Sequence, residues 1–241
     1  MRWWLGWGWL WVLGVLVGAP PAGADDTLDR LTEARGKAGG VQSYQADFTV
    51  TVVEEGRPST MTGTVVYQRP DKRRIEFTTT QPDAGLAQLV VSNGLFEWQY
   101  FPSAKVVYQT EWSKLKAGDV PAEALELRGL HQPFIDVEPE TIRLVETATA
   151  GDQRLYVFEA DPTTSLVEGA PFTPGKIRVE VGADDGLTRR LTMTNAQGRE
   201  VLVQQYTNVQ INVPVQAEQF AFTPPPEVQV VDVSEERAGG A

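Results

Sequence analysis

The sequence predicts a mainly β protein of the α+β class, built around one large curved antiparallel sheet of about ten or eleven strands. Apolar and polar residues alternate with a period of two in many short segments, which is typical of half-buried strands. Glycine-containing pairs that favour tight turns separate these segments. Because each strand is twisted, so many strands in succession tend to curl, and we expect a deeply curved sheet or a barrel.

The first predicted strand covers 44–52 and shows the alternation most clearly. One of its faces carries Tyr44, Ala46, Phe48, Val50 and Val52. The pattern recurs in the segments 61–67, 75–77, 96–100, 156–160, 177–181 and 187–193. Turns that need a positive φ are expected at Glu55-Gly56, Asn93-Gly94, Asp185-Gly186 and Gln197-Gly198. A longer loop, interrupted by proline and glycine, is expected over 161–175.

Two segments have helical periodicity instead. The first is expected to begin with Asp25 or Asp26 as the N-cap and to end at Gly39-Gly40. Its apolar stripe would consist of Leu28, Leu31 and Ala34. The second lies within 114–132, where Asp119 is a suitable cap. Its apolar surface would come from Leu125, Leu127 and Leu130.

The N-terminal segment 1–24 is predicted to be a cleavable signal peptide. Arg2 precedes an unbroken apolar run over 3–17, and the small residues Ala22-Gly23-Ala24 follow it, which is the order of a secretory signal. A membrane-spanning helix needs about 20 apolar residues, and Pro20 breaks this run early. We therefore expect cleavage after Ala24 and export from the cytoplasm. Lipidation would require a cysteine, and the chain has none.

The rest of the chain is expected to form one domain over 25–233, followed by a disordered tail over 234–241. The formal net charge of −11 argues against a nucleic-acid partner, because phosphates would be repelled. The lack of cysteine excludes thiol redox chemistry and cysteine-rich metal sites. We expect a monomer.

No catalytic constellation is visible in the sequence. His131 is the only histidine, so a Ser-His-Asp triad or a multi-histidine metal site cannot be built elsewhere. We expect it to lie in a loop or at a helix end without a special role. The carboxylate pairs fall in turns or in the tail, at Glu54-Glu55, Asp184-Asp185 and Glu235-Glu236. No glycine-rich phosphate loop is present. The sequence thus predicts neither an enzyme nor a metal or cofactor site.

What the sequence does offer is apolar and aromatic surface on curved strands and on two helices. This surface either packs as an ordinary core or lines a cavity that the helices cover, and periodicity does not distinguish the two. Ten residues are candidates for such a cavity wall: Phe48, Val50, Val65, Tyr67, Ile75, Phe77, Trp98, Tyr100, Leu125 and Phe158.

Five short motifs follow one another along the chain. They are Val41-Gln42-Ser43-Tyr44-Gln45-Ala46-Asp47-Phe48 after the first helix; Gly63 with Arg69-Pro70; Gln81-Pro82; Val91-Ser92-Asn93-Gly94 followed by Trp98, Tyr100 and Pro102; and Phe220-Ala221-Phe222-Thr223-Pro224-Pro225 before Val228 and Val230. In this order, after a signal peptide, they resemble the periplasmic outer-membrane lipoprotein carriers, the LolA family. Each motif is weak alone, but together they span nearly the whole exported chain.

The resemblance implies an incomplete antiparallel β-barrel of about eleven strands, covered by a helical lid. It implies the periplasm as the destination of the exported chain, and a cavity that carries the acyl chains of lipoproteins, without a cofactor. Cargo would come from an ABC-type lipoprotein-releasing complex of the inner membrane and pass to an outer-membrane lipoprotein receptor. In the family, the arginine of the Arg-Pro pair reaches carbonyls of the lid, which assigns Arg69 the role of a lid latch.

One segment departs from the family pattern. The family usually has an aromatic residue shortly after this proline, whereas here Lys72, Arg73 and Arg74 precede Ile75. This basic stretch puts the handover to a receptor in question and is compatible with other cargo. Three alternatives therefore stay open: a lipid-sensing regulatory module that uses the same cavity, an enzyme that acts on envelope lipid or glycan, and a structural envelope protein with a filled core.

Overall fold

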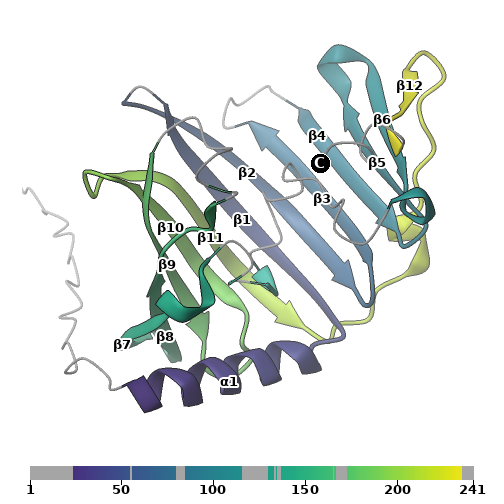
Figure 1. The fold of residues 1–241 in the computed structure, drawn as a ribbon. Helices are drawn as coiled ribbons and strands as arrows, with labels where there is room; N and C mark the ends of the chain where they lie inside the picture. Colours follow the sequence, from purple (N-terminus) through teal and green to yellow (C-terminus); the bar gives the residue numbers. More distant parts are fainter. Residues whose placement is uncertain are drawn as a thin grey trace, which may run out of the picture.

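The computed structural model describes residues 24–54, 56–79, 85–115, 130–132, 134, 137–164, 166 and 173–234. Within these ranges, twelve strands form one sheet in the order β12-β6-β5-β4-β3-β2-β1-β11-β10-β9-β8-β7. Figure 1 shows that the sheet curves strongly and stays open, with β7 and β12 at its two edges. The predicted curved, mainly β fold is therefore confirmed as an open sheet that does not close into a barrel.

The twelve strands are β1 Ser43–Glu54, β2 Arg57–Gln68, β3 Lys72–Thr79, β4 Leu86–Asn93, β5 Phe96–Phe101, β6 Val106–Glu111, β7 Arg143–Ala150, β8 Gln153–Ala160, β9 Pro174–Gly182, β10 Thr188–Asn195, β11 Glu200–Ile211 and β12 Gln229–Asp232. Short 3-10 helices cover Pro102–Ala104, Trp112–Lys114, Pro139–Thr141 and Ala217–Phe220. All seven segments with a clear period of two lie in strands, apart from Leu187, which directly precedes β10. The alternation is weaker in β7, an edge strand that is largely exposed, and in β11, whose pairings with β1 and β10 contain register shifts.

The four predicted turn glycines have the positive φ that their turns require, 78° at Gly56, 90° at Gly94, 72° at Gly186 and 75° at Gly198. Gly186, which joins β9 to β10, has a second reason to be glycine. A Cβ atom on it would come within 2.0 Å of the Ala34 carbonyl oxygen and 2.7 Å of the Ala38 nitrogen. The turn therefore touches the backbone of a helix.

That helix, α1 (Ala24–Gly40), lies along one end of the sheet (Figure 1). Its buried stripe consists of Thr27, Leu31, Ala34 and Ala38. The expectation that Leu28 shares this stripe was wrong, because Leu28 is 64% exposed. Thr27 takes the corresponding place, and its hydroxyl oxygen accepts a hydrogen bond of 3.0 Å from the Leu144 backbone in β7. A hydrogen-bonding side chain thus docks the start of the helix on the edge strand.

Strand register defines two faces of the sheet, because directly opposed residues project from the same side. The inner face carries one row formed by Tyr44, Tyr67, Arg73, Ser92 and Glu97. The next inner row is Ala46, Val65, Ile75, Val90 and Gln99. The outer face carries the intervening row of Gln45, Val66, Arg74, Val91 and Trp98.

The C-terminal segment crosses the outer face before it joins the sheet. Phe220 is 2% exposed next to Lys72, and the ring of Phe222 lies 6.0 Å from the rings of both Trp98 and Tyr100. After this crossing, β12 pairs with β6 in parallel, whereas the other pairs are antiparallel. The purely antiparallel succession expected from the sequence fails here, since the crossing segment replaces a hairpin.

Some predictions fall outside the described residues: the leader over 1–23, most of the helix within 114–132 with Leu125, and the tail over 235–241. The predicted start of the tail can be corrected by one residue. Ser234 is fully buried, and its hydroxyl oxygen accepts a hydrogen bond of 2.8 Å from the Glu111 backbone. Ser234 therefore belongs to the packed domain.

The contact between Gly186 and α1 can be tested against a matched glycine. Alanine at either Gly186 or Gly198 would be forced to a positive φ, which costs about 1–2 kcal/mol. Around Gly198 a Cβ would meet nothing within 4 Å, whereas at Gly186 it would clash with α1, which adds about 1–3 kcal/mol. We expect Gly186→Ala to lower the free energy of unfolding clearly more than Gly198→Ala, as measured by denaturant titration. Equal losses would show that the helix does not press on this turn.

Candidate ligand-binding cavity

A cavity of about 940 Å³ lies on the inner face, at the end of the sheet that α1 covers. Its described walls come from α1, from strands β1 to β3 and the turn between β2 and β3, and from residues around 112 and 131. The lining residues are Ala34, Arg35, Ala38, Gly39, Tyr44, Val65, Tyr67, Arg69, Pro70, Asp71, Arg73, Ile75, Gly94, Trp112, His131, Gln132, Phe134 and Gly186. The cavity is at the upper end of the range of about 300–1,000 Å³ that small-molecule sites occupy.

One wall of the cavity is an aromatic stack. The Tyr67 ring stacks on both Tyr44 and His131, with ring centroids 4.9 Å and 4.5 Å away, and the Tyr44 and His131 rings are themselves 5.8 Å apart. The Tyr44 hydroxyl and His131 Nδ1 are joined by a hydrogen bond of 2.9 Å. Burial raises the pKa of Tyr44 well above its ordinary value. Burial, followed by the charges of Arg69 and Arg73, lowers the pKa of His131 to about 4. The bond therefore joins two neutral groups at neutral pH.

The opposite end of the same inner row holds a buried ion pair. Arg73 donates to the carboxylate of Glu97, whose side chain is 1% exposed. The Arg73 guanidinium carbon lies 5.8 Å from the ring centre of Trp112. Its Nε atom is buried and has no hydrogen-bond partner in the described part of the chain. A pair like this is costly to break, because either partner alone would leave a buried charge.

Arg69 connects the turn after β2 to the C-terminal end of α1. Its Nε donates to the Val41 carbonyl at 2.7 Å, and Nη2 donates to the Ala38 carbonyl at 3.2 Å. Carbonyls at the end of a helix lack intrahelical partners and carry partial negative charge, so a guanidinium suits them. The peptide bond between Arg69 and Pro70 is cis. The side chain thus reaches the element that forms one wall of the cavity.

The predicted wall residues divide into three groups. Val65, Tyr67 and Ile75 line the cavity. Phe48, Val50 and Phe77 lie on the same inner face, in the adjoining core cluster. Phe158 lies in a second core cluster and packs edge-on against Phe134 at 5.3 Å. Leu125 is outside the described residues.

Trp98 and Tyr100 require a correction, because the structure places them on the outer face. In the register, Trp98 pairs with Val91, and Gln99 pairs with Val90 of the inner face. Both aromatic side chains pack against Phe222 instead of facing the cavity. Strand periodicity identifies two faces but not which of them is inner, and in β5 the inner face is the polar one, with Glu97 and Gln99.

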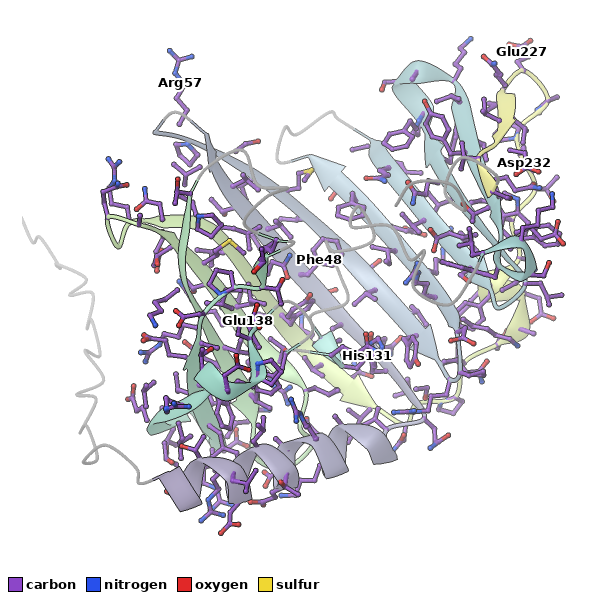
Figure 2. All side chains as sticks on the ribbon, viewed as in Figure 1. Phe48, Arg57, His131, Glu138, Glu227 and Asp232 are labelled. Carbon is purple, nitrogen blue, oxygen red and sulfur yellow. The ribbon has the colours of Figure 1, made fainter. Side chains whose placement is uncertain are left out.

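Several lining residues were not anticipated. Arg73 precedes Ile75 and Phe77 by two and four residues, so it lies on the same face of β3 as they do. The predicted strand began at Ile75, and an extension by two residues would have indicated that Arg73 points inward. His131 carried no local signal. It lies in a turn, as expected, and its hydrogen bond to Tyr44 and its stacking on Tyr67 place it in the cavity wall. Figure 2 shows His131 near the α1 end of the sheet and Arg57 at the opposite end.

The described residues contain no group of three or more histidine, cysteine or acidic side chains that could hold a metal ion. In the same part of the chain, no helix combines the length and the hydropathy needed to cross a membrane. The cavity on the inner face is lined by apolar and aromatic side chains and by three arginines.

Comparisons with known proteins agree with this geometry. The family model of the outer membrane lipoprotein carrier protein LolA matches residues 39–223. An uncharacterized conserved protein from Thermus thermophilus superposes with a TM-score of 0.54 at 14% identity, over 87% of this chain and 98% of that one. MucB superposes with a TM-score of 0.51 at 16% identity, over 87% of this chain and 66% of that one. Identities this low establish similarity of fold alone. A search of curated proteins gave no significant match.

The lowered pKa of His131 predicts a specific loss of stability in acid. Its pKa is about 4 in the folded protein against an ordinary value of 6.5, so below pH 6.5 the unfolded chain takes up the proton first. Stability is therefore lost as the pH falls from 6.5 towards 4, by up to about 3 kcal/mol. We expect His131→Gln to lack this part of the loss in denaturant titrations at pH 7 and pH 4.5. Profiles that fall in parallel would contradict the assignment.

Proposed function

The chain belongs to the family of the outer membrane lipoprotein carrier protein LolA, and from that premise we propose that it is a periplasmic chaperone for lipoproteins. It binds their acyl chains in the cavity on the inner face and shuttles them from the inner to the outer membrane. The observation that carries the proposal is the cavity of about 940 Å³ between α1 and the sheet, with Val65, Tyr67 and Ile75 in its wall.

The size and lining of this space suit a lipid anchor. Burial of hydrocarbon stabilises a complex by about 0.8 kcal/mol per methylene, so each long acyl chain left in water is costly. A wide cavity with apolar and aromatic side chains in its wall lowers that cost without fixing the chain in one pose. Release is then possible when an acceptor offers a comparable apolar environment.

The handling of cargo follows from the same proposal. Cargo arrives from an ABC-type lipoprotein-releasing complex in the inner membrane and leaves to an outer-membrane lipoprotein receptor. Cleavage after Ala24 frees the carrier in the periplasm, and it works without a cofactor. We propose binding and not catalysis. The only histidine of the sequence, His131, is hydrogen-bonded to the Tyr44 hydroxyl, and its pKa of about 4 makes it a weak base at neutral pH.

Arg69 is proposed as the latch between the sheet and α1. Its two hydrogen bonds to Val41 and Ala38 hold the end of the helix against the cavity mouth. The side chain is exposed, so these bonds contribute little to global stability and can open at modest cost. Opening of α1 at this end would widen the route for an acyl chain.

The primary test of function is native mass spectrometry of the protein purified from its own periplasm. We expect bound lipoprotein or its acylated fragment. A protein that carries no lipid and binds no hydrophobic dye would overturn the carrier proposal. Recovery of a lipid together with a stable regulatory partner protein would favour the lipid-sensing module instead.

A blocked cavity should lose its ligand. We expect Val65→Trp to reduce the affinity for a fluorescent 16-carbon fatty acid by about ten-fold or more, because the indole occupies space that the chain needs. The matched control is Thr64→Trp, since Thr64 is the exposed neighbour on the outer face of the same strand. Equal affinities in the two variants, by fluorescence titration, would place the ligand elsewhere.

Loss of the latch should change release more than stability. For Arg69→Leu we expect cargo transfer to acceptor vesicles to accelerate several-fold, while the free energy of unfolding falls by about 1 kcal/mol or less. Arg69→Lys is the control, because it keeps the charge but loses the planar two-pronged donor. Transfer rates equal to those of the parent protein in Arg69→Leu would refute the latch.

A further inference from the structure

The charged groups of the cavity are distributed against the trend of the whole chain. The chain has 32 acidic and 21 basic residues other than histidine. Among the described residues that line the cavity, however, three are arginines, Arg35, Arg69 and Arg73, and one is acidic, Asp71. A basic lining in an acidic protein is not expected from composition and calls for a physical explanation.

Two of these arginines have no carboxylate to neutralise them in the described ranges. The ion pairs found there include Arg73 with Glu97, but none involves Arg35 or Arg69. Elsewhere on α1 the pattern differs, because Arg30 and Lys37 are both paired with Glu33. Arg35 and Arg69 thus line the cavity without a carboxylate partner among the described residues.

The third arginine, Arg73, has a buried hydrogen-bond donor without an acceptor among the described residues. Arg73 gives one nitrogen to Glu97, while its buried Nε has no partner in the described part of the chain. Buried donors without an acceptor are rare in folded proteins because they lose hydration without compensation. The lowered pKa of His131, to which the charges of Arg69 and Arg73 contribute, reflects the same positive potential.

Apolar side chains adjoin these arginines. Val65 and Ile75 lie in the inner row next to Tyr67 and Arg73, and Ala38 of α1 belongs to the same apolar cluster. A ligand that fills the cavity therefore meets both hydrocarbon and guanidinium groups. Guanidinium groups bind phosphate and carboxylate oxygens with paired, charge-assisted hydrogen bonds.

We propose that the cavity selects anionic amphiphiles: Arg35, Arg69 and Arg73 bind a phosphate or carboxylate head group, and the apolar wall takes the acyl chain attached to it. The inference rests on the proposed function, because it assumes that an acyl chain enters the cavity. It narrows the cargo to lipids or lipid-modified molecules with negative charge close to the chain.

The test compares three probes on the protein expressed with its own N-terminal segment and stripped of lipid. Dodecyl phosphate carries chain and charge, dodecyl maltoside carries the same chain without charge, and inorganic phosphate carries charge without a chain. Affinities are measured by calorimetry at low and at high salt. In parallel, NMR follows His131, which gives an unambiguous signal because it is the only histidine in the sequence.

We expect dodecyl phosphate to bind about ten-fold or more tightly than dodecyl maltoside at low salt, with the advantage shrinking as salt is added. Inorganic phosphate should bind weakly. Bound dodecyl phosphate should raise the pKa of His131, because an anion offsets the charges of Arg69 and Arg73, whereas the groups that face the ring from the sheet, Tyr44 and Tyr67, stay neutral.

The variant Arg35→Gln should clearly reduce the preference for dodecyl phosphate while binding of dodecyl maltoside persists, and Arg69 is left intact because it is the proposed latch. Arg57→Gln is the matched control, since Arg57 is an exposed arginine at the far end of the sheet (Figure 2). Arg73 is left intact because its removal would leave the buried carboxylate of Glu97 without its ion-pair partner. Circular dichroism checks that both variants fold.

Each outcome has a distinct meaning. Equal affinity for the two dodecyl probes, or an unchanged pKa of His131, would overturn the head-group inference and leave the carrier proposal standing. Inorganic phosphate that binds as tightly as dodecyl phosphate would show a site for free anions and would also overturn it. If neither dodecyl probe binds, the proposed function fails together with the inference.

Discussion

Helix α1 meets the turn between β9 and β10 at a point where no side chain fits between the two backbones. Gly186 supplies both the positive φ of the turn and the space for Ala34 and Ala38. The Lys37 ammonium donates to the Ala183 carbonyl beside the same contact. From the other side, Arg69 binds the Ala38 and Val41 carbonyls. The position of the cavity depends on this double attachment, because α1 is one of its walls.

The attachment differs in strength along the helix. The start of α1 is docked by the buried Thr27 on β7, and its middle is packed through Leu31 and Ala34. The end is held by the buried Ala38 and by hydrogen bonds from Lys37 and from the exposed Arg69, and water can replace the Arg69 bonds at little cost.

The inner face combines two demands that usually oppose each other. Val65 and Ile75 provide hydrocarbon, while the neighbouring row of Tyr44, Tyr67 and Arg73 provides polar atoms next to it. Burial makes these polar groups expensive unless they are paired, and the pairs Tyr44 with His131 and Arg73 with Glu97 meet most of that cost. What remains unmet in the described part of the chain is the buried Nε of Arg73.

The sequence by itself determined the β class, the curvature of the sheet, the positions of the clear strands and the glycine turns, because period-two alternation and positive φ are local properties of the chain. It also grouped the apolar residues of β1 to β3 on one face of each strand, without showing which face is inner. Only the tertiary structure decided that Trp98 and Tyr100 face outward and that β12 runs parallel to β6. It also decided that Thr27, and not Leu28, belongs to the buried stripe of α1. It likewise brought His131 to Tyr44 across 87 residues of chain. These features depend on which elements pack on each face, and no local pattern encodes contacts between segments so distant in sequence.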